Sequence, residues 1–570
     1  MAIKDKEKKE KTDIKLAQLL REQEEQRAKN LAAELGFPYF DLRIATIDDE
    51  ALLISTEPES REAKAAIIQK KQNELFTVVI DPKLKQTTAF IKHFEGLGYK
   101  TNILIGSKSG LEKALAKYKT LKPKKTEISK EVEMNTEEFA AIQKEIKDIR
   151  DLKEKLAQPN LSTTQLLNII MASALKLEAS DIHFEAQGDQ TTRLRFRLDG
   201  ILQDAADILS SVYQLLLSRI KILSELKLNV HNVPQDGRFS FISAYGPGGG
   251  KQIENRVSII PADYGENIVI RILDPKTINL NLNDLGIQDF DYKIIEKELQ
   301  KPNGMILTTG PTGSGKTTLL YACLKKVNSP ESKIITLENP IEYHLEGIEQ
   351  TQVDSEEGYT FAAGLRSILR QDPDIILVGE VRDNETAETA INAALTGHLV
   401  FSTLHTNDAA GAIPRLVDMK VNPTLIPPAL NLVIAQRLVR KICSKCSKDI
   451  KPDKETMEKI KTGLESLPAR GASELARVAG GPKLDNITIK QISKEGCAYC
   501  NFTGYKGRVG VFELFIIDDV MEKVILKTPS NVEIKESAIK AGMVLMRQDG
   551  LLKVLQKITT LDEVERILGV

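Results

Sequence analysis

The sequence predicts a multidomain α/β protein, and three observations support this class. At ~100 to 200 residues per domain, a chain of 570 residues holds three or four domains, each able to bury its own core. In the C-terminal half, short apolar runs alternate with helical patterns, which is typical of a parallel sheet with crossover helices. The motif GPTGSGKTT, residues 310–318, stands between one apolar run and a helical segment. We therefore expect a phosphate-binding-loop domain preceded by an α+β middle domain and a small α/β domain.

The composition is that of an ordinary globular protein, with 41% apolar and 28% charged residues. The 79 Lys and Arg residues against 80 Asp and Glu residues give no global basic excess of the kind that nucleic-acid-binding proteins carry. The first residues, MAIKDKEKKEKTD, are charged and lack the apolar core of a signal peptide. No apolar run approaches the ~20 residues that span a bilayer. We therefore expect a cytosolic protein whose contact with a membrane is peripheral.

An N-terminal α/β domain is expected over residues 1–120. Residues 13–35 have a helical pattern that ends at Gly36, a residue suited to a helix C-cap. The apolar positions of this helix are Leu16, Leu19, Leu20, Leu31 and Leu35. The runs FTVVI at 76–80 and NILIG at 102–106 predict buried strands. Residues 121–160 become polar and rich in Lys and Glu, so we expect a linker that carries a solvated helix.

A middle domain is expected over residues 161–273. It begins with a helix at 162–178, and the alternation in TRLRFRLDG and FSFISAY predicts strands. The run GPGGG at 246–250 suits a hairpin loop, because glycine accepts the positive φ angles of such turns. A polar connector then leads to the third domain, residues 274–570. Its last helix should begin at Thr560, because Thr560 and Glu563 have capping-box spacing.

The motif at 310–318 has the context that a phosphate-binding loop requires. It follows the apolar MILTT and precedes the helical LLYACLKK. Glycines let backbone N–H groups close around phosphates, and the helix N-terminus favours anions. Lys316 should reach the β- and γ-phosphates of the nucleotide, and Thr317 should bind Mg²⁺. The nucleotide-binding residues expected from the motif are Gly310, Pro311, Thr312, Gly313, Ser314, Gly315, Lys316, Thr317 and Thr318.

Three further apolar runs end on a polar side chain: IITL on Glu338, IILVG on Glu380 and LVFSTL on His405. Ligands of an open parallel sheet bind beyond the carboxyl ends of its strands, so these side chains should converge on one nucleotide. Glu380 has the Walker-B position, where a carboxylate holds Mg²⁺ directly or through water. Glu338 is the candidate for orienting and activating the attacking water. The alternative is that either glutamate is a surface residue at a strand end, and the division of labour between them stays open.

His398 and His405, two of only six histidines, lie on either side of LVFSTL. If this run is extended, their separation of seven residues spans ~23 Å and places the two side chains on opposite faces. They cannot bind one ion unless the chain bends sharply between them. His405 should lie near the γ-phosphate and His398 at the opposite end of the strand. The alternative for both is a structural histidine with satisfied hydrogen bonds.

Four of the five cysteines form two Cys-x-x-Cys pairs, Cys443/Cys446 and Cys497/Cys500. This spacing is that of a tetrahedral zinc site with four thiolates, although the insert at 447–496 is longer than in a compact ribbon. A redox role is the alternative, but two paired motifs favour structural zinc in a subdomain at about 440–512, followed by C-terminal helices at 513–570. Cys323, in the helix after the phosphate loop, is expected to be a buried small residue.

Together these motifs resemble those of the secretion ATPases that power type IV pilus assembly and type II secretion. The resemblance rests on GPTGSGKTT, TLENPIEY, LRQDPDIILVGEVRD, ALTGHLVFSTLHTND and the cysteine pairs, and upstream on ASDIHFE, RLRFRLDG, VPQDGR and RVSIIP. It covers about residues 160–570 in order. It implies a RecA-like motor domain joined flexibly to a PAS-like middle domain. It also implies a ring of six subunits that binds ATP at subunit boundaries and couples its hydrolysis to pilus or pseudopilus assembly or to protein secretion.

The same resemblance implies roles for further residues. TLENPIEY matches the family's Asp box, and Gly397 to Thr406 matches its His box, whose histidines couple nucleotide state to the neighbouring domain. Asn339 stands where the family usually has an acid after Glu338, so Glu338 becomes the more important carboxylate of this box. Tyr264 stands where the family commonly has a histidine before a Gly-Glu pair. Middle-domain arginines should reach the phosphates when a subunit closes, although a strand-face role is the alternative for any one of them. The candidates are Arg195, Arg197, Arg219, Arg256 and Arg271.

The resemblance also implies partners. The N-terminal domain should dock on a membrane-anchored protein, and the motor should act on an inner-membrane platform protein. No arginine-led motif supports the cyclic-dinucleotide binding of some relatives. Pilus retraction motors are one alternative, but they generally lack the long N-terminal region and the cysteine insert. A nucleic-acid motor of the RecA or helicase type is an alternative from another class, against which the near-neutral charge argues. A nucleotide-binding scaffold without turnover is a third.

Overall fold

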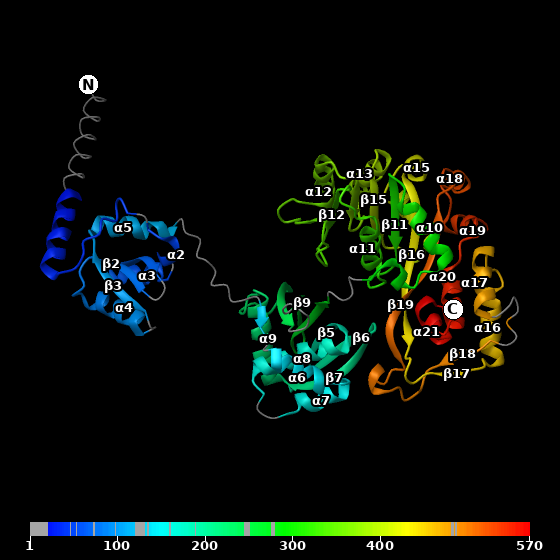
Figure 1. Ribbon diagram of the computed structural model, residues 1–570, viewed down its shortest axis with the longest axis horizontal. Coiled ribbons are helices and arrows are strands. Elements are labelled where there is room, and N and C mark those ends of the chain that lie inside the picture. Colours follow the sequence, from blue (N-terminus) through cyan, green and yellow to red (C-terminus); the bar gives the residue numbers. More distant parts are fainter. Residues whose placement is uncertain are drawn as a thin grey trace, which may run out of the picture. The chain divides into compact units, whose positions relative to one another are not determined.

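The computed structural model divides into two units, Met1–Ile128 and Ser129–Val570 (Figure 1). The residues it describes are 21–45, 47–52, 54–71, 74–96, 99–119, 131–133, 136–158, 161–188, 190–243, 251–274, 280–479, 484 and 487–569. Three expected features lie outside these ranges: helix residues 13–20 with Leu16, Leu19 and Leu20, the first part of the expected linker, and the glycine-rich loop at 246–250.

The N-terminal unit is built on a three-stranded sheet with the order β1-β2-β3. Its strands are β1 (Ala65–Lys71), β2 (Glu74–Val79) and β3 (Lys100–Ile105), with β1 antiparallel and β3 parallel to β2. The strands expected at 76–80 and 102–106 are present as β2 and β3. Strand β1 is additional, because its exposed end, Gln69 to Lys71, hides the apolar pattern. The helices are residues 21–35, α2 (Asp49–Leu52), α3 (Glu57–Ala63), α4 (Lys85–Gly96) and α5 (Lys108–Ala116).

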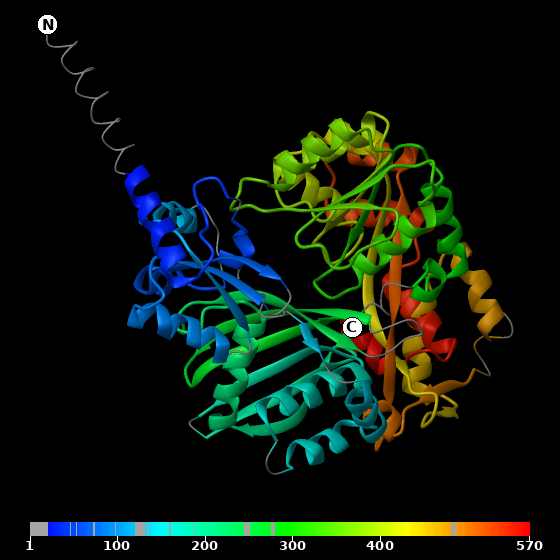
Figure 2. The same ribbon diagram turned by 60° about the vertical axis from the view of Figure 1, so that its left-hand side comes forward.

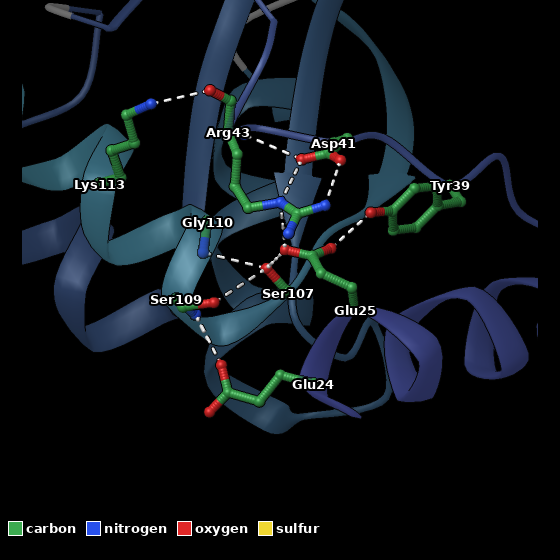
Figure 3. A network of polar contacts seen from close by, with 9 residues as sticks. All are labelled: Glu24, Glu25, Tyr39, Asp41, Arg43, Ser107, Ser109, Gly110 and Lys113. Carbon is green, nitrogen blue, oxygen red and sulfur yellow. Dashed lines mark hydrogen bonds and ion pairs between the residues drawn. The ribbon is translucent and has the colours of Figure 1, made fainter. Parts of the chain in front are cut away.

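Two carboxylates hold the helix at 21–35 against the start of α5 (Figure 3). Glu25 is 5% exposed and accepts hydrogen bonds from the Ser107 hydroxyl at 2.6 Å and from the Tyr39 hydroxyl. Burial and the neighbouring Glu25 raise the pKa of Tyr39, which keeps its hydroxyl a donor. Glu24 Oε2 accepts from the backbone N–H of Ser109 at 3.2 Å. N–H groups in the first turn of a helix lack internal partners, so Glu24 helps to cap α5, while Glu25 binds the hydroxyl of its N-cap, Ser107; together they fix the first helix in place.

The middle part of the chain forms a seven-stranded sheet with the order β4-β8-β9-β10-β5-β6-β7, antiparallel except for the parallel pair β4 and β8. Buried and half-buried residues alternate along β6, as TRLRFRLDG predicts. In Figure 2 the helices of this part, in cyan, lie together on one face of the sheet. The strands are β4 (Glu131–Glu133), β5 (Ala179–Gln187), β6 (Thr191–Leu198), β7 (Ile201–Leu209), β8 (Gln235–Ser243), β9 (Lys251–Ala262) and β10 (Gly265–Leu273).

The expectation of a solvated helix within a linker at 121–160 is wrong for residues 136–156. Two helices occupy this stretch, α6 (Thr136–Glu145) and α7 (Ile149–Leu156). Phe139, Ile142 and Leu152 are buried in the same apolar cluster as α8 (Thr163–Leu177) and α9 (Ser210–Leu223). The few apolar residues of α6 and α7 are spaced so that they share one helical face. The polar average composition of this segment concealed that face, which packs on the middle domain.

The C-terminal part contains the predicted parallel sheet, with the order β13-β12-β14-β15-β11-β16-β19. Only the pair β16 and β19 is antiparallel. Leu307 of β11 belongs to the same apolar cluster as Ala390 of α13 (Asn384–Leu395), whereas its neighbour Ile306 belongs to the cluster of Leu319 of α11 (Lys316–Val327). Helices therefore cover both faces. The strands are β11 (Gly304–Thr309), β12 (Ile334–Glu338), β13 (Glu349–Gln352), β14 (Ile375–Val378), β15 (Leu399–Leu404), β16 (Leu430–Ile442) and β19 (Tyr505–Ile516).

A small subdomain and a helical end complete the C-terminal part. The strands β17 (Lys448–Ile450) and β18 (Ile489–Gln491) pair between the two cysteine motifs. Thr560 is the N-cap of the last helix and accepts from the Glu563 backbone N–H at 3.2 Å, so the predicted start is confirmed. Within the described ranges, each helix is too short or too polar to cross a bilayer. The other helices are α10 (Asp289–Leu299), α12 (Phe361–Ile368), α14 (Ala412–Asp418), α15 (Ile426–Ala429), α16 (Lys454–Leu464), α17 (Ala469–Ala479), α18 (Asp519–Ile525), α19 (Asn531–Lys540), α20 (Met546–Leu555) and α21 (Leu561–Leu568).

Candidate active site

The expected polar residues lie along one edge of the parallel sheet. The strands β12, β14, β15 and β11 are consecutive neighbours in it. Their registers place Leu337 beside Val378, Val378 beside Ser402, and Thr309 beside Leu404, so the strands end at the same level. The phosphate loop follows β11 directly, and His405 follows β15. Glu338 is the last residue of β12, and Glu380 comes two residues after the end of β14. Ligands of such sheets bind beyond this edge.

The loop between β11 and α11 has the conformation that phosphate binding requires. Gly310, Gly313 and Gly315 have φ angles of 147°, 77° and 92°, which side-chain-bearing residues rarely adopt. A Cβ atom on Gly310 would lie 2.5 Å from the carbonyl oxygen of Gln436. Lys316 begins α11, and its ammonium donates to the carbonyl oxygens of Gly310 at 2.8 Å and Pro311 at 3.1 Å. The loop therefore curls around this cation. The other loop residues of the motif, Thr312, Thr317 and Thr318, are exposed or half-buried.

Lys316 is a buried cation in this loop. Burial lowers the pKa of Lys316 to about 8, against the opposing effect of the Glu380 carboxylate. A second buried polar atom, Ser314 Oγ, has no hydrogen-bond partner among the described residues. Buried polar groups are usually paired, so an ammonium with a depressed pKa and an unpaired hydroxyl both fit an anionic ligand in the loop.

Nucleotide affinity is expected to fall as the pH rises through about 8. Below this pH the ammonium of Lys316 is charged in the free protein, whereas above it phosphate binding must first restore the proton. Affinity for ADP should then fall by up to about tenfold per pH unit. Equilibrium binding of fluorescent ADP on both sides of this pH checks the expectation, and calorimetry in two buffers of different ionisation enthalpy detects the proton uptake. Affinity that does not change across this range would contradict it.

Glu338 is buried and accepts three hydrogen bonds. It is 4% exposed, and its Oε2 accepts from the Tyr321 hydroxyl of α11 at 2.5 Å. Its Oε1 accepts from Thr336 Oγ1 at 2.6 Å and from Gln350 Nε2 at 3.1 Å. Burial and Glu338 raise the pKa of Tyr321, so this hydroxyl remains a donor. The carboxylate is thus held in one orientation between the phosphate-loop helix and strand β13.

Glu380, His405 and Lys316 lie near enough to one another to interact electrostatically. Glu380 is 15% exposed in its side chain, and its Oε2 lies 2.7 Å from Arg382 Nε and 3.7 Å from His405 Nε2. Burial and the nearby Lys316 ammonium lower the pKa of His405. His405 is held in place through its neighbour Thr406, whose backbone N–H donates to Thr309 Oγ1 at 2.9 Å. These contacts tie the ends of β11, β14 and β15 together.

His398 lies at the other end of β15, away from these groups along the strand. Its Nδ1 lies 3.0 Å from the carbonyl oxygen of Ala393 at the end of α13, and its own carbonyl oxygen accepts from Gly304 N–H at 3.1 Å. The two histidines therefore flank an extended strand. This geometry agrees with the structural alternative for His398 and leaves its sensing role a prediction.

Among the candidate arginines, Arg256 contacts the motor domain. Its guanidinium donates to the carbonyl oxygen of Ile341 at 2.8 Å and lies 3.1 Å from Glu342 Oε1, in the segment that follows Glu338. Three of the other candidates pair with carboxylates of the middle domain. Arg195 pairs with Glu185, and Arg197 and Arg271 pair with Asp181 at 3.4 and 3.0 Å. The fourth, Arg219, has a buried Nε without a hydrogen-bond partner among the described residues.

The two cysteine pairs come together in a second site. Within the described residues, Cys443, Cys446, Cys497 and Cys500 form the one cluster with metal-ligand geometry, and their sulfur atoms lie within 4.8 Å of one another. Three measured Sγ···Sγ distances are 3.8, 3.8 and 3.7 Å. A tetrahedron with Zn–S bonds of about 2.3 Å has edges of about 3.8 Å, so the donor set fits a zinc ion. Cys323 is separate and fully buried.

Tyr321, Gln350 and Arg382 join the site without having been expected there. Tyr321 is the one hydroxyl in the apolar run LLYACL, which is a weak signal that it points to a polar group. Gln350 lies on the edge strand β13, and its amide also accepts from Leu345 N–H at 2.7 Å. No local pattern links it to Glu338. Only the parallel pairing of β12 with β13 does so.

Comparisons with known proteins give matches over most of the chain. A family model described as "Type II/IV secretion system protein" matches residues 157–566. The type II secretion system protein E of Pectobacterium carotovorum subsp. carotovorum is 42% identical over 433 residues, 76% of this chain and 80% of that protein. The type IV pilus assembly ATPase PilB of Myxococcus xanthus (strain DK1622) is 34% identical over 540 residues, 94% of this chain and 89% of that protein. The structure of the ATPase DotB of Yersinia pseudotuberculosis, 19% identical, covers 71% of this chain and 93% of that chain with a TM-score of 0.51, and shows the shared fold.

The family model extends over the phosphate loop, the three strand-end residues and the cysteine pairs, which lie between residues 310 and 500. The chain therefore belongs to the type II/IV secretion system family, as a phosphate-loop ATPase of type II secretion or type IV pilus assembly.

Proposed function

We propose that the edge formed by the ends of β11, β12, β14 and β15 is where this ATPase binds and hydrolyses ATP. The observation that carries the proposal is the grouping of Lys316, Glu380 and His405 within one electrostatic cluster beside the buried Glu338. The backbone N–H groups of residues 310–318 and the Lys316 ammonium bind the β- and γ-phosphates. This arrangement places positive charge where the transferred phosphoryl group gains negative charge.

Glu338 orients the attacking water. Its oxygens already accept from Tyr321, Thr336 and Gln350, so the carboxylate cannot rotate freely and presents its remaining lone pairs in a fixed direction. The water oxygen attacks the γ-phosphorus, the bond to the β–γ bridging oxygen breaks, and ADP leaves with that oxygen. A proton of the water passes to Glu338 or to the phosphate product.

Two metal ions fit the described residues. Thr317 and Glu380 would hold Mg²⁺, which neutralises phosphate charge when it is bound with ATP. Cys443, Cys446, Cys497 and Cys500 would hold Zn²⁺ as a structural ion with no open position for chemistry. The half-buried Glu380 and the sulfur spacing, which fits a tetrahedron, support these assignments.

The active form is a ring of six subunits with ATP at the subunit boundaries, and arginines of the middle domain stabilise the phosphate charge when a subunit closes. Arg256 contacts Ile341 and Glu342, which supports the proposal that middle-domain arginines can approach the segment after Glu338. Arg195, Arg197, Arg219 and Arg271 are the further candidates. The ring works on the cytoplasmic side of the inner membrane, with the N-terminal unit docked on a membrane-anchored protein and the motor acting on a platform protein.

The turnover of the full chain should respond to membrane components and not to DNA. We expect a platform-protein fragment or anionic vesicles to stimulate the ATPase activity at least about fivefold. This factor corresponds to the lower end of typical coupling free energies between two sites. Phosphate release is measured with each addition separately. The Lys316→Ala variant with the same additions controls for contaminating ATPases. If only DNA stimulated turnover, the result would contradict a role in secretion or pilus assembly and would favour a nucleic-acid motor.

A further inference from the structure

The seven residues after the second cysteine pair, 501–507, form a loop whose shape depends on that pair. The backbone N–H of Phe502 donates to the carbonyl oxygen of Cys497 at 3.0 Å, and that of Gly504 lies 3.3 Å from Cys500 Sγ. Phe502 has a φ angle of 62°, which is unfavourable for an aromatic residue and persists only where surrounding contacts impose it. The cysteine cluster thus determines where the Phe502 ring lies.

The same loop contacts the middle domain at three points, if the helices α6 and α7 that pack on this domain are counted with it. The guanidinium carbon of Arg150 lies 3.6 Å from the centre of the Phe502 ring, within the range of a cation–π contact. The backbone N–H of Gly507 donates to Asp199 Oδ2 at 3.0 Å. The Lys506 ammonium lies 2.8 Å from Glu178 Oε2. Each contact pairs groups of complementary charge or polarity.

The three middle-domain groups come from three different elements. Arg150 lies in the first turn of α7, Glu178 caps the C-terminus of α8, and Asp199 lies in the turn between β6 and β7. Leu152 of α7 and Leu177 of α8 are buried in one apolar cluster. The surface that meets residues 501–507 therefore exists only in the folded middle domain, and a movement of this surface moves the domain as a whole.

We propose that residues 501–507 are the docking surface that holds the middle domain on the motor domain of the same chain, and that the metal-loaded cysteine cluster keeps this surface in shape. The metal's part in this inference rests on the proposed zinc site, whereas the docking contacts stand on their own geometry. Since the middle domain carries the arginines proposed to reach ATP, the cluster would act on the motor by holding that domain in place.

Hydrogen–deuterium exchange of the full chain tests the docking surface. Arg150→Ala should raise exchange of the 501–507 amides roughly two- to fivefold, the range that a cation–π contact at an exposed site implies, with zinc still at one ion per chain by elemental analysis. Lys445→Ala is the matched control, since the Lys445 ammonium lies 4.2 Å from the Tyr499 ring within the cluster itself. Glu178→Lys and Lys506→Glu should each raise exchange, and the double variant should restore it.

Zinc removal from the wild-type chain by a chelator tests the role of the metal. Exchange should then rise both in 497–507 and in the middle-domain segments around Arg150 and Asp199. A rise confined to 497–507 would overturn the metal's role in docking, and unchanged exchange in Arg150→Ala would overturn the docking surface itself. A chain that binds no zinc would refute the zinc site, while the arginine and charge-swap variants would still decide the docking surface.

Discussion

Lys316→Ala is expected to lower ATP turnover by at least about 10²- to 10³-fold, the loss typical for a group that stabilises transition-state charge. The ammonium stands within the phosphate loop, bonded to the carbonyl oxygens of Gly310 and Pro311. With ATP bound, we expect it to turn from these carbonyls to the phosphates. Its removal leaves the loop without its cation. Steady-state phosphate release at saturating ATP measures the effect.

The fold should survive this change, because alanine is a good helix former at the start of α11 and the substitution removes a buried charge. Thermal unfolding and zinc content should match those of the wild-type chain. Lys326→Ala is the matched control on the same helix, since Lys326 makes a surface ion pair with Glu296 at 3.0 Å. Turnover near the wild-type level in Lys316→Ala would refute the phosphate-loop assignment.

Glu338→Gln is expected to lower kcat by roughly 10²- to 10⁴-fold while the KM for ATP changes little. Glutamine has the same shape; its single amide oxygen can still accept from Thr336 and Gln350, while its NH2 group can donate to the Tyr321 hydroxyl oxygen, so the site should keep its structure. What it loses is the negative charge that orients and activates water. Single-turnover hydrolysis, combined with equilibrium binding of a nucleotide analogue, separates the chemical step from binding.

Glu349→Gln is the control for the same substitution on the neighbouring strand, where the side chain is exposed. It should leave both kcat and KM unchanged. Glu380→Gln separates the two carboxylates: if Glu380 holds Mg²⁺, its loss should raise the Mg²⁺ concentration needed for half-maximal turnover, whereas loss of Glu338 should not. Phosphate release that stays unchanged in both glutamine variants would show that these carboxylates do not support the hydrolysis, and would favour a nucleotide-binding scaffold whose site does not turn ATP over.

The grouping of the candidate site residues at one edge of the sheet could be predicted from sequence, because its signals are local. A phosphate loop requires glycines and a lysine at fixed spacing, and Lys316 begins a helix for this reason. Glu338, Glu380 and His405 each close an apolar run. Parallel strands place their carboxyl ends at one edge, so a one-dimensional pattern was enough to group these residues. The groups that hold Glu338 could not be predicted, because Gln350 reaches it only through the pairing of β12 and β13.

The linker expectation failed for a related reason. Residues 136–156 are polar on average, yet Phe139, Ile142 and Leu152 are buried against the middle domain. Average composition decides whether a segment can fold alone. It does not reveal whether a narrow apolar face finds a partner elsewhere in the chain.

The sequence by itself determined the chemistry of this protein: the phosphate loop, the strand-end carboxylates and the two Cys-x-x-Cys pairs all depend on spacings within one turn or strand. The tertiary structure alone decided how these pieces meet. The two cysteine pairs join because β16 and β19 run antiparallel with Ile442 opposite Tyr505. The contacts of Arg150, Glu178 and Asp199 with residues 501–507 likewise depend on long-range packing. Such contacts join residues far apart in the chain, whose proximity no local pattern encodes.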